Sequence, residues 1–106
     1  MAYDEGLLER CLDALIVLNA GPIRNKNVFG MRGLLRGSTM FAAVGETSMI
    51  VKLRPAEYEA AVTDAAMRPF QPGGQKLGNW IEIDAAAVAD DPQLQEWLEA
   101  GLRAIR

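Results

Sequence analysis

The positions of apolar side chains divide the chain into helical and extended segments. Residues 4–20 predict a first helix, because apolar side chains recur there at helical intervals. The positions on this stripe are Leu8, Cys11, Leu12, Leu15 and either Leu18 or Asn19. Asp4 is placed to cap the helix, since a carboxylate can accept hydrogen bonds from free backbone N–H groups. Gly21 and Pro22 then end it, because proline cannot continue a helix.

Residues 23–54 have the pattern of short strands. Glycines at spacings too short for helices separate runs at 23–29, 33–36, 39–44 and 48–53. These runs predict three or four strands joined by tight turns, and hence an antiparallel meander whose clearest hairpin is Gly45-Glu46-Thr47. In the last run, alternation places Met49, Val51 and Leu53 on the face expected to line the core.

The segment after the meander predicts a helix, a loop and a strand. Pro55 suits the first turn of a helix that extends to about Ala66. Prolines and glycines then predict a loop over 67–78, with a short extended piece at 68–71. Residues 79–83 follow as the last strand.

Two aspartates mark the start of the final helical elements. Asp84 is expected to cap a short helical turn at 85–89, and Asp91 to cap the last helix with Pro92 at its first position. The order is therefore helix, three or four strands, helix, strand, helix. We predict a two-layer α+β fold, with one antiparallel sheet of about five strands and helices on one face. With 106 residues, half of them hydrophobic, we expect residues 1–106 to form a single domain.

Composition excludes several kinds of chemistry. The chain has no histidine, which excludes histidine metal sites and Ser-His-Asp triads. Cys11 is the one cysteine, so no internal disulfide can form, and its place on the apolar stripe of the first helix predicts a core position. We therefore expect no catalytic residues, no metal, no cofactor and no enzymatic activity.

Other candidate motifs have structural explanations. The glycine-rich segment 73–79 has the glycine spacing of a phosphate loop but lacks the Lys-Ser/Thr pair, which favours a turn. Paired carboxylates can act as acid and base or bind a hard cation. Here Glu82 and Asp84 share a strand face, and cap positions account for Asp84 and Asp91. The aromatic residues expected in the core or an interface are Phe29, Phe41, Trp80 and Trp97.

Charge is distributed unevenly along the chain. The net charge is −3 overall, but residues 23–54 carry six basic side chains against Glu46 alone. The flanking helical segments are acidic. The six basic residues are Arg24, Lys26, Arg32, Arg36, Lys52 and Arg54. If helices cover one sheet face, the other face or an edge should collect this positive charge, and we take these six residues as the candidate interaction surface.

Two interpretations of this basic segment stay open. The six residues are either solvated sheet residues that discourage aggregation, or a surface that binds an acidic protein or nucleic acid. The sequence pI of about 4.9 and the lack of a basic helix face weigh against a dedicated DNA-binding domain. Nucleic-acid binding is therefore an alternative to protein binding and not the favoured function.

The N-terminal segment does not have the pattern of an export signal. It is acidic where a secretory signal is basic, and its uncharged stretch is far shorter than the roughly 20 apolar residues of a membrane span. With a single cysteine, we expect a cytoplasmic protein with no membrane partner.

Short motifs along nearly the whole chain resemble the TfoX (Sxy) N-terminal domain family. They are Met1-Ala2-Tyr3-Asp4-Glu5, Val28-Phe29-Gly30-Met31-Arg32-Gly33-Leu34-Leu35, Met40-Phe41-Ala42-Ala43-Val44, the strand 49–53, Pro55 with Glu57 and Tyr58, Arg68-Pro69-Phe70, Leu77-Gly78-Asn79-Trp80-Ile81-Glu82-Ile83 and Asp91-Pro92-Gln93-Leu94-Gln95-Glu96-Trp97-Leu98. The resemblance lies in their order and spacing. The family usually has Met-Phe-Gly where this chain has Val28-Phe29-Gly30.

The resemblance implies a secretion-chaperone-like α+β fold and a regulatory role. Larger members carry a second helical domain and regulate natural competence together with the cyclic-AMP receptor protein. We expect a stand-alone, single-domain member that acts as a regulatory or adaptor domain in transcription or competence, by contact with a regulatory protein partner. A homodimer formed through the exposed sheet face or an edge strand is a further expectation.

Overall fold

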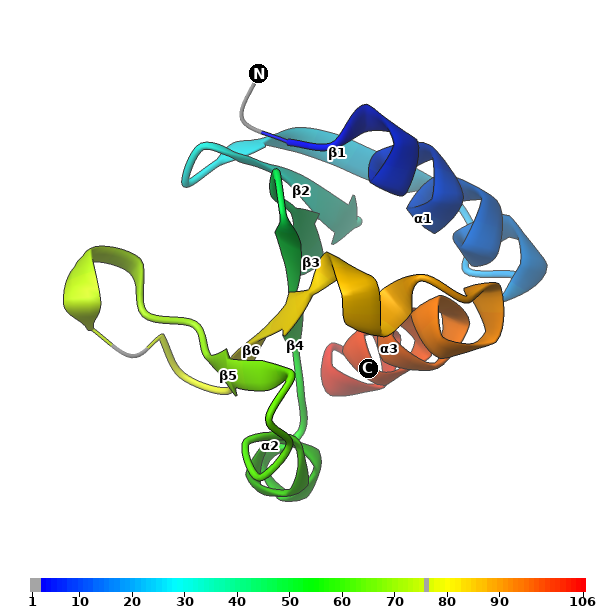
Figure 1. The fold of residues 1–106 in the computed structure, drawn as a ribbon. Coiled ribbons are helices and arrows are strands. Elements are labelled where there is room, and N and C mark those ends of the chain that lie inside the picture. The colour runs from blue at the N-terminus through cyan, green and yellow to red at the C-terminus, as the bar shows by residue number, and fades with distance from the viewer. Residues whose placement is uncertain (1–2, 76) are drawn as a thin grey trace.

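The computed structural model describes residues 3–75 and 77–106. Met1 and Ala2 of the opening motif, and Lys76 of the glycine-rich segment, lie outside the described residues. The elements are α1 (Glu5–Val17), β1 (Ile23–Val28), β2 (Met31–Arg36), β3 (Thr39–Val44), β4 (Ser48–Lys52), α2 (Pro55–Ala61), β5 (Met67–Pro69), η1 (Pro72–Gly74), β6 (Trp80–Asp84), η2 (Ala85–Val88) and α3 (Asp91–Ala104). Figure 1 shows α1 and α3 on one side of the sheet and the loop that carries η1 projecting from it.

The sheet is antiparallel throughout and has the strand order β1-β2-β3-β4-β6-β5. The predicted meander is confirmed, because β1 to β4 are neighbours in chain order. The described residues form six strands where about five were expected. The added strand is β5, which lies where a short extended piece was predicted at 68–71. The predicted α+β class is confirmed.

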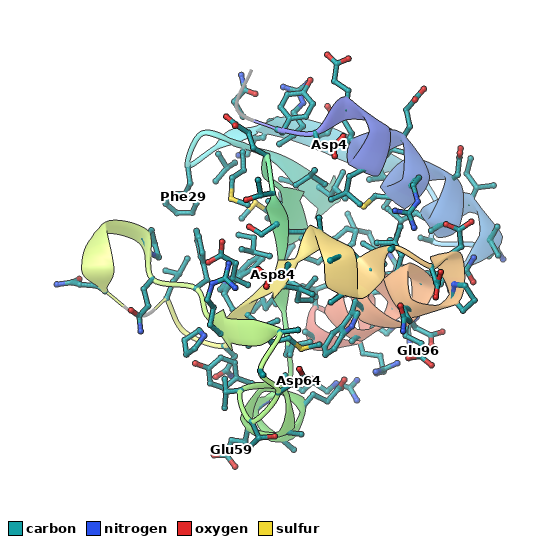
Figure 2. All side chains as sticks on the ribbon, viewed as in Figure 1. Asp4, Phe29, Glu59, Asp64, Asp84 and Glu96 are labelled. Atoms are coloured by element: carbon teal, nitrogen blue, oxygen red, sulfur yellow. The ribbon has the colours of Figure 1, made fainter. Side chains whose placement is uncertain are left out.

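The first two helices start where predicted but end earlier. The carboxylate of Asp4 accepts a hydrogen bond from the N–H of Leu7 at 3.2 Å, which confirms the predicted cap. Figure 2 shows Asp4 at the start of α1. α2 ends at Ala61 and not near Ala66. There the side chain of Asp64 accepts from the N–H of Ala66 at 2.8 Å, and such local bonds compete with helical ones.

Two predicted caps are wrong in detail. Asp90 and not Asp91 occupies the cap position of α3, and Asp91 is its first helical residue. Asp84 precedes η2, but its carboxylate makes no capping hydrogen bond. Both carboxylates bind arginines from other elements: Arg10 lies 3.0 Å from Asp91, and Arg68 lies 2.7 Å from Asp84. Both carboxylates therefore take part in longer-range ion pairs where the sequence suggested local caps.

The main core lies between the sheet and the helices. Alternate residues of the central strands, Val44, Met49 and Val51 among them, are fully buried beneath α1 and α3. A register shift between β2 and β3 also turns Phe41 into this core. Gly101 lets α3 approach closely, because a Cβ there would lie 2.9 Å from the carbonyl oxygen of Phe41.

The reverse face of the sheet holds a second, smaller apolar cluster. Its buried members are Ala43, Ile50 and Trp80, and its partly buried members are Met31, Met40, Phe70 and Leu77. Phe70 and Leu77 come from the loop between β5 and β6, which lies against this face. We expected the reverse face to be free, and this is wrong at its centre. What the fold leaves exposed is the sheet's edge at β1, whose residues 24–27 are all exposed.

Candidate functional site: a basic sheet edge

The strand register determines where the six predicted basic residues lie. Residues that pair across strands share a face. Arg24, Lys26 and Lys52 lie on the reverse face, because they pair with Leu35, Gly33 and Trp80 respectively. Arg32 and Arg36 alternate to the helix-covered face of β2. The six residues therefore do not form one basic face.

Four of the six nevertheless gather at one edge. Arg24, Lys26, Arg32 and Arg36 all belong to the β1–β2 hairpin, and β1 is the last strand on its side of the sheet. No aspartate or glutamate occurs from residue 23 to residue 45. We call this hairpin the basic edge. It carries positive charge on both faces of a strand pair whose outer strand is exposed, and its own segment contains no acid to neutralise that charge.

The other two cations have different surroundings. Lys52 lies on β4 in the interior of the sheet order, opposite Trp80. Arg54 lies beyond β4, where its Nε donates to the carbonyl oxygen of Arg103 at 3.2 Å. That carbonyl is in the last turn of α3, where a cation stabilises the negative end of the helix dipole. Arg54 therefore has a structural role, and the predicted surface loses these two members.

Arg32 holds the side chains of β1 in place. Its Nε donates to Oδ1 of Asn25 at 2.6 Å, and its guanidinium NH1 donates to Oδ1 of Asn27 at 2.9 Å. Both asparagines use their acceptor oxygens on Arg32, so their amide nitrogens are left as donors. On this face too, the polar side chains of the basic edge offer positive charge and N–H donors.

The turn between β1 and β2 sets which backbone groups point outward. Phe29 and Gly30 both have positive φ, as in the two-residue turns that join hairpins. The flanking residues Val28 and Met31 then form a hydrogen-bonded pair. Such pairs alternate with non-bonded pairs along an antiparallel ladder. The N–H and C=O groups of Asn25 and Asn27 therefore point away from β2, toward the open edge.

Phe29 occupies a conformation that a bulky residue rarely adopts. Its φ is 54°, and the residue is 56% exposed. Its ring meets that of Phe70 edge-on, with the ring centroids 5.8 Å apart. Figure 2 shows it at the tip of the hairpin. A positive φ in such a residue costs about 1–3 kcal/mol and is concentrated at functional sites. From the sequence we expected Phe29 in the core or an interface and did not predict the strained backbone. The feature that could have indicated the strain is an aromatic residue directly before glycine in a two-residue turn.

The opposite edge, at β5, has no outward N–H group to offer. The N–H of Phe70 donates to the carbonyl oxygen of Trp80 at 3.0 Å, and the N–H of Asp84 donates to that of Ala66 at 3.3 Å. Because inward and outward positions alternate, the backbone N–H and C=O of Arg68 also point toward β6. The two outward positions are Met67, whose N–H is taken by the carbonyl of Asp64 at 3.1 Å, and Pro69, which has none. Arg68 is paired with Glu82 and Asp84.

The side chains that could carry chemistry are engaged in the structure. Cys11 is fully buried as predicted, and burial raises the pKa of its thiol to about 12 although Arg10 opposes the shift. Glu82 accepts from Ser48 Oγ at 2.7 Å in addition to its pair with Arg68. Across residues 3–75 and 77–106, no group of three or more acidic, cysteine or histidine side chains is arranged to hold a metal. No helix in the described ranges is both long and apolar enough to cross a membrane.

A hollow of about 330 Å³ lies between α2 and α3. Glu57, Trp97 and Arg103 line it. Glu57 and Arg103 form an ion pair across it at 2.8 Å, and this hydrogen bond lowers the pKa of Glu57. The ion pair joins the two helices, which gives the recess a structural explanation.

Comparison with known proteins identifies one family. The family model described as the TfoX N-terminal domain matches residues 16–105. No curated protein and no solved structure gives a significant match.

Proposed function

The chain belongs to the TfoX N-terminal domain family, and from this membership we propose that it is a small regulatory domain that binds an acidic segment of a partner protein through its basic edge. The observation that carries the proposal is the β1–β2 hairpin, which combines four cations, no acid and an outer strand with one edge not paired to another strand. Transcription or competence, in the cytoplasm, is the setting that family membership favours.

Two features of the molecule support binding over catalysis. The one thiol is buried and protonated at neutral pH, and Glu82 and Asp84 are engaged by Arg68 and Ser48. A positive φ in a bulky residue instead lies at the tip of the basic edge, where the exposed ring of Phe29 is available as an apolar anchor. Aromatic anchors beside charged groups are common in protein interfaces.

Direct nucleic-acid binding through the same cations is the second candidate. The concentration of positive charge on one hairpin favours it. Against it, Arg24 and Lys26 lie on one face of the strand pair while Arg32 and Arg36 lie on the other, so one phosphate backbone cannot meet all four at once. The acidic pI adds long-range repulsion. We therefore place protein binding first.

Affinity capture from a lysate of the cell that makes the protein tests the proposal. The bait variants are wild type, the double variant Arg24→Glu/Lys26→Glu, and Lys52→Glu as a matched control. Lys52 shares the face of Arg24 and Lys26 but lies off the edge. We expect a protein retained by wild type and by Lys52→Glu, and lost by the double variant. If the double variant retains the same proteins as wild type, the proposal is wrong.

The nucleic-acid alternative is tested by fluorescence anisotropy with labelled duplex and single-stranded DNA. Binding through phosphates weakens steeply as salt rises. We expect no such binding at low salt. Salt-dependent binding that the double variant loses would instead support the second candidate.

A further inference from the structure

We propose that β1 accepts an extended segment of the partner as a seventh strand of the sheet, and that this segment carries acidic side chains at alternate positions. The inference rests on the proposed function, because it states how the partner engages the basic edge. Its occupant is a strand of a different protein and not a second copy of this chain.

The backbone of β1 is suited to this addition. All six of its residues pair with β2 without a register shift, and the strand contains no proline. Its inner four residues are exposed. The outward groups of Asn25 and Asn27 supply the N–H and C=O positions with which an added strand would continue the ladder. The other edge cannot compete, because Met67 and Pro69 of β5 present no available N–H.

The charges on β1 specify the partner's pattern. Arg24 and Lys26 are two residues apart and project from the reverse face. In an antiparallel addition, the partner residues opposite them belong to non-hydrogen-bonded pairs, in which the Cα atoms approach to about 4.5 Å. Opposite charges in such pairs stabilise a sheet. Acidic residues at alternate positions of the partner therefore meet Arg24 and Lys26, while the residues between them meet the amide groups of Asn25 and Asn27.

The same geometry opposes pairing with a second copy. A two-fold axis normal to the sheet keeps the faces aligned, so a cation of one copy would lie opposite a cation of the other. With the axis through Asn25, Arg24 faces Lys26; with the axis through Lys26, that lysine faces itself. Like charges directly opposite each other destabilise strand pairs. The homodimer expected from the sequence is therefore disfavoured at this edge.

A peptide titration followed by amide chemical shifts tests the strand addition, since shifts detect binding even in the millimolar range. The probe is a peptide of alternating threonine and glutamate as long as β1. Its control has the same composition with all glutamates consecutive. We expect the alternating peptide to shift the amides of Asn25 and Asn27 and to bind roughly tenfold tighter than the control.

A matched pair of variants tests whether the backbone takes part. Asn25→Pro removes an outward N–H without touching the bonds to β2, and Asn25→Ala removes only the side chain. We expect Asn25→Ala to bind the alternating peptide and Asn25→Pro to lose most of its binding. Near-ultraviolet and far-ultraviolet circular dichroism of both variants checks that the fold is kept.

The outcomes separate this inference from the proposed function. If both peptides bind alike and Asn25→Pro equals Asn25→Ala, strand addition is wrong but the basic edge still attracts an acidic protein. If neither peptide shifts the amides, strand addition is also wrong, and lysate capture with Arg24→Glu/Lys26→Glu decides the proposed function by itself. Self-association in sedimentation that Asn25→Pro abolishes would overturn the claim that the added strand comes from another protein.

Discussion

The sheet ends in two antiparallel edge strands, β1 and β5, whose exposed groups differ. β5 has three residues, ends in Pro69, and gives its one outward N–H to Asp64. Its arginine, Arg68, is paired with two carboxylates of β6. β1 has six residues, no proline, and cations for which its own hairpin provides no acid. Proteins usually protect an exposed sheet edge against pairing with another strand. Here the β5 edge is protected by its lack of a free outward N–H group, whereas the β1 edge is protected only by its charge.

The contrast shows that an arginine's role depends on what its strand register brings beside it. Arg68 and Arg24 both lie on the reverse face of an edge strand. The register places Glu82 opposite Arg68 but Leu35 opposite Arg24. Arg68 therefore contributes to internal cohesion, whereas Arg24 is available to an external partner. Charge that repels a second copy of the same edge attracts a strand of opposite charge.

Charge reversal on β6 next to the β5 edge and charge reversal on the β1 edge should have very different effects on stability. Glu82→Lys removes the acceptor of the buried Ser48 and places a cation beside Arg68. We expect it to lower the free energy of unfolding by about 2 kcal/mol. Lys26→Glu, at an exposed position without an acid partner in its hairpin, should change it by less than about 0.5 kcal/mol. Denaturant unfolding measures both.

Glu82→Gln is the control for this comparison, because it keeps an acceptor for Ser48 and adds no cation. It should fall between wild type and Glu82→Lys. Equal losses for Glu82→Lys and Lys26→Glu would mean that both edges contribute alike to stability, and the contrast between them would fail.

The turn of the open edge should contain backbone strain that a substitution can release. Phe29→Gly and Phe29→Ala both lose the ring contact with Phe70, which is worth about 0.5–1.5 kcal/mol. Only glycine accepts the positive φ without cost. We expect Phe29→Gly to be at least about 1 kcal/mol more stable than Phe29→Ala, and close to wild type in thermal unfolding. Equal stabilities for the two variants would show that the turn is unstrained.

Element order was predictable from the sequence because apolar periodicity and proline or glycine breaks are local signals. The Asp4 cap, the start of α2 at Pro55 and the meander follow from such signals. The candidate site was only partly predictable. Composition identified a basic segment, but which of its cations share an edge depends on the strand register. Arg54 makes a hydrogen bond to the end of α3, which is a contact between residues distant in sequence. The strain at Phe29 also needs coordinates, since φ is a property of the folded backbone.

Acid should weaken the side of the molecule near β5 before it affects the basic edge. Glu57 and Met67 of β5 line the same recess, and the hydrogen bond from Arg103 holds the pKa of Glu57 below its ordinary value. A carboxyl group whose pKa is lowered by folding stabilises the folded state at pH values above its ordinary pKa of about 4.3. This contribution to the free energy of unfolding is lost as the pH falls through the pKa of the folded state. The pair is partly exposed, so the loss should be under about 1 kcal/mol.

Urea unfolding of wild type and Glu57→Gln across this pH range measures the effect. Wild type should lose its advantage over the variant as the medium becomes acidic. Amide shifts of β1 should stay nearly constant over the same range, because residues 23–45 contain no acid. A constant difference between the two proteins at every pH would contradict the expected linkage.

The smallest expected effect is on the hydrogen-exchange rates of backbone amides and not on the free energy of unfolding. Hydrogen exchange of the β1 amides should alternate, with Arg24 and Lys26 protected by bonds to β2 and Asn25 and Asn27 exchanging rapidly. On β5, Arg68 should be protected by β6 and Met67 by its bond to Asp64, so no alternation should appear. Slow exchange at both Asn25 and Asn27 in the free protein would mean that the outer edge of β1 is already occupied. A strand could then be added only by displacing that occupant, and the difference between the two edges would lose its physical basis.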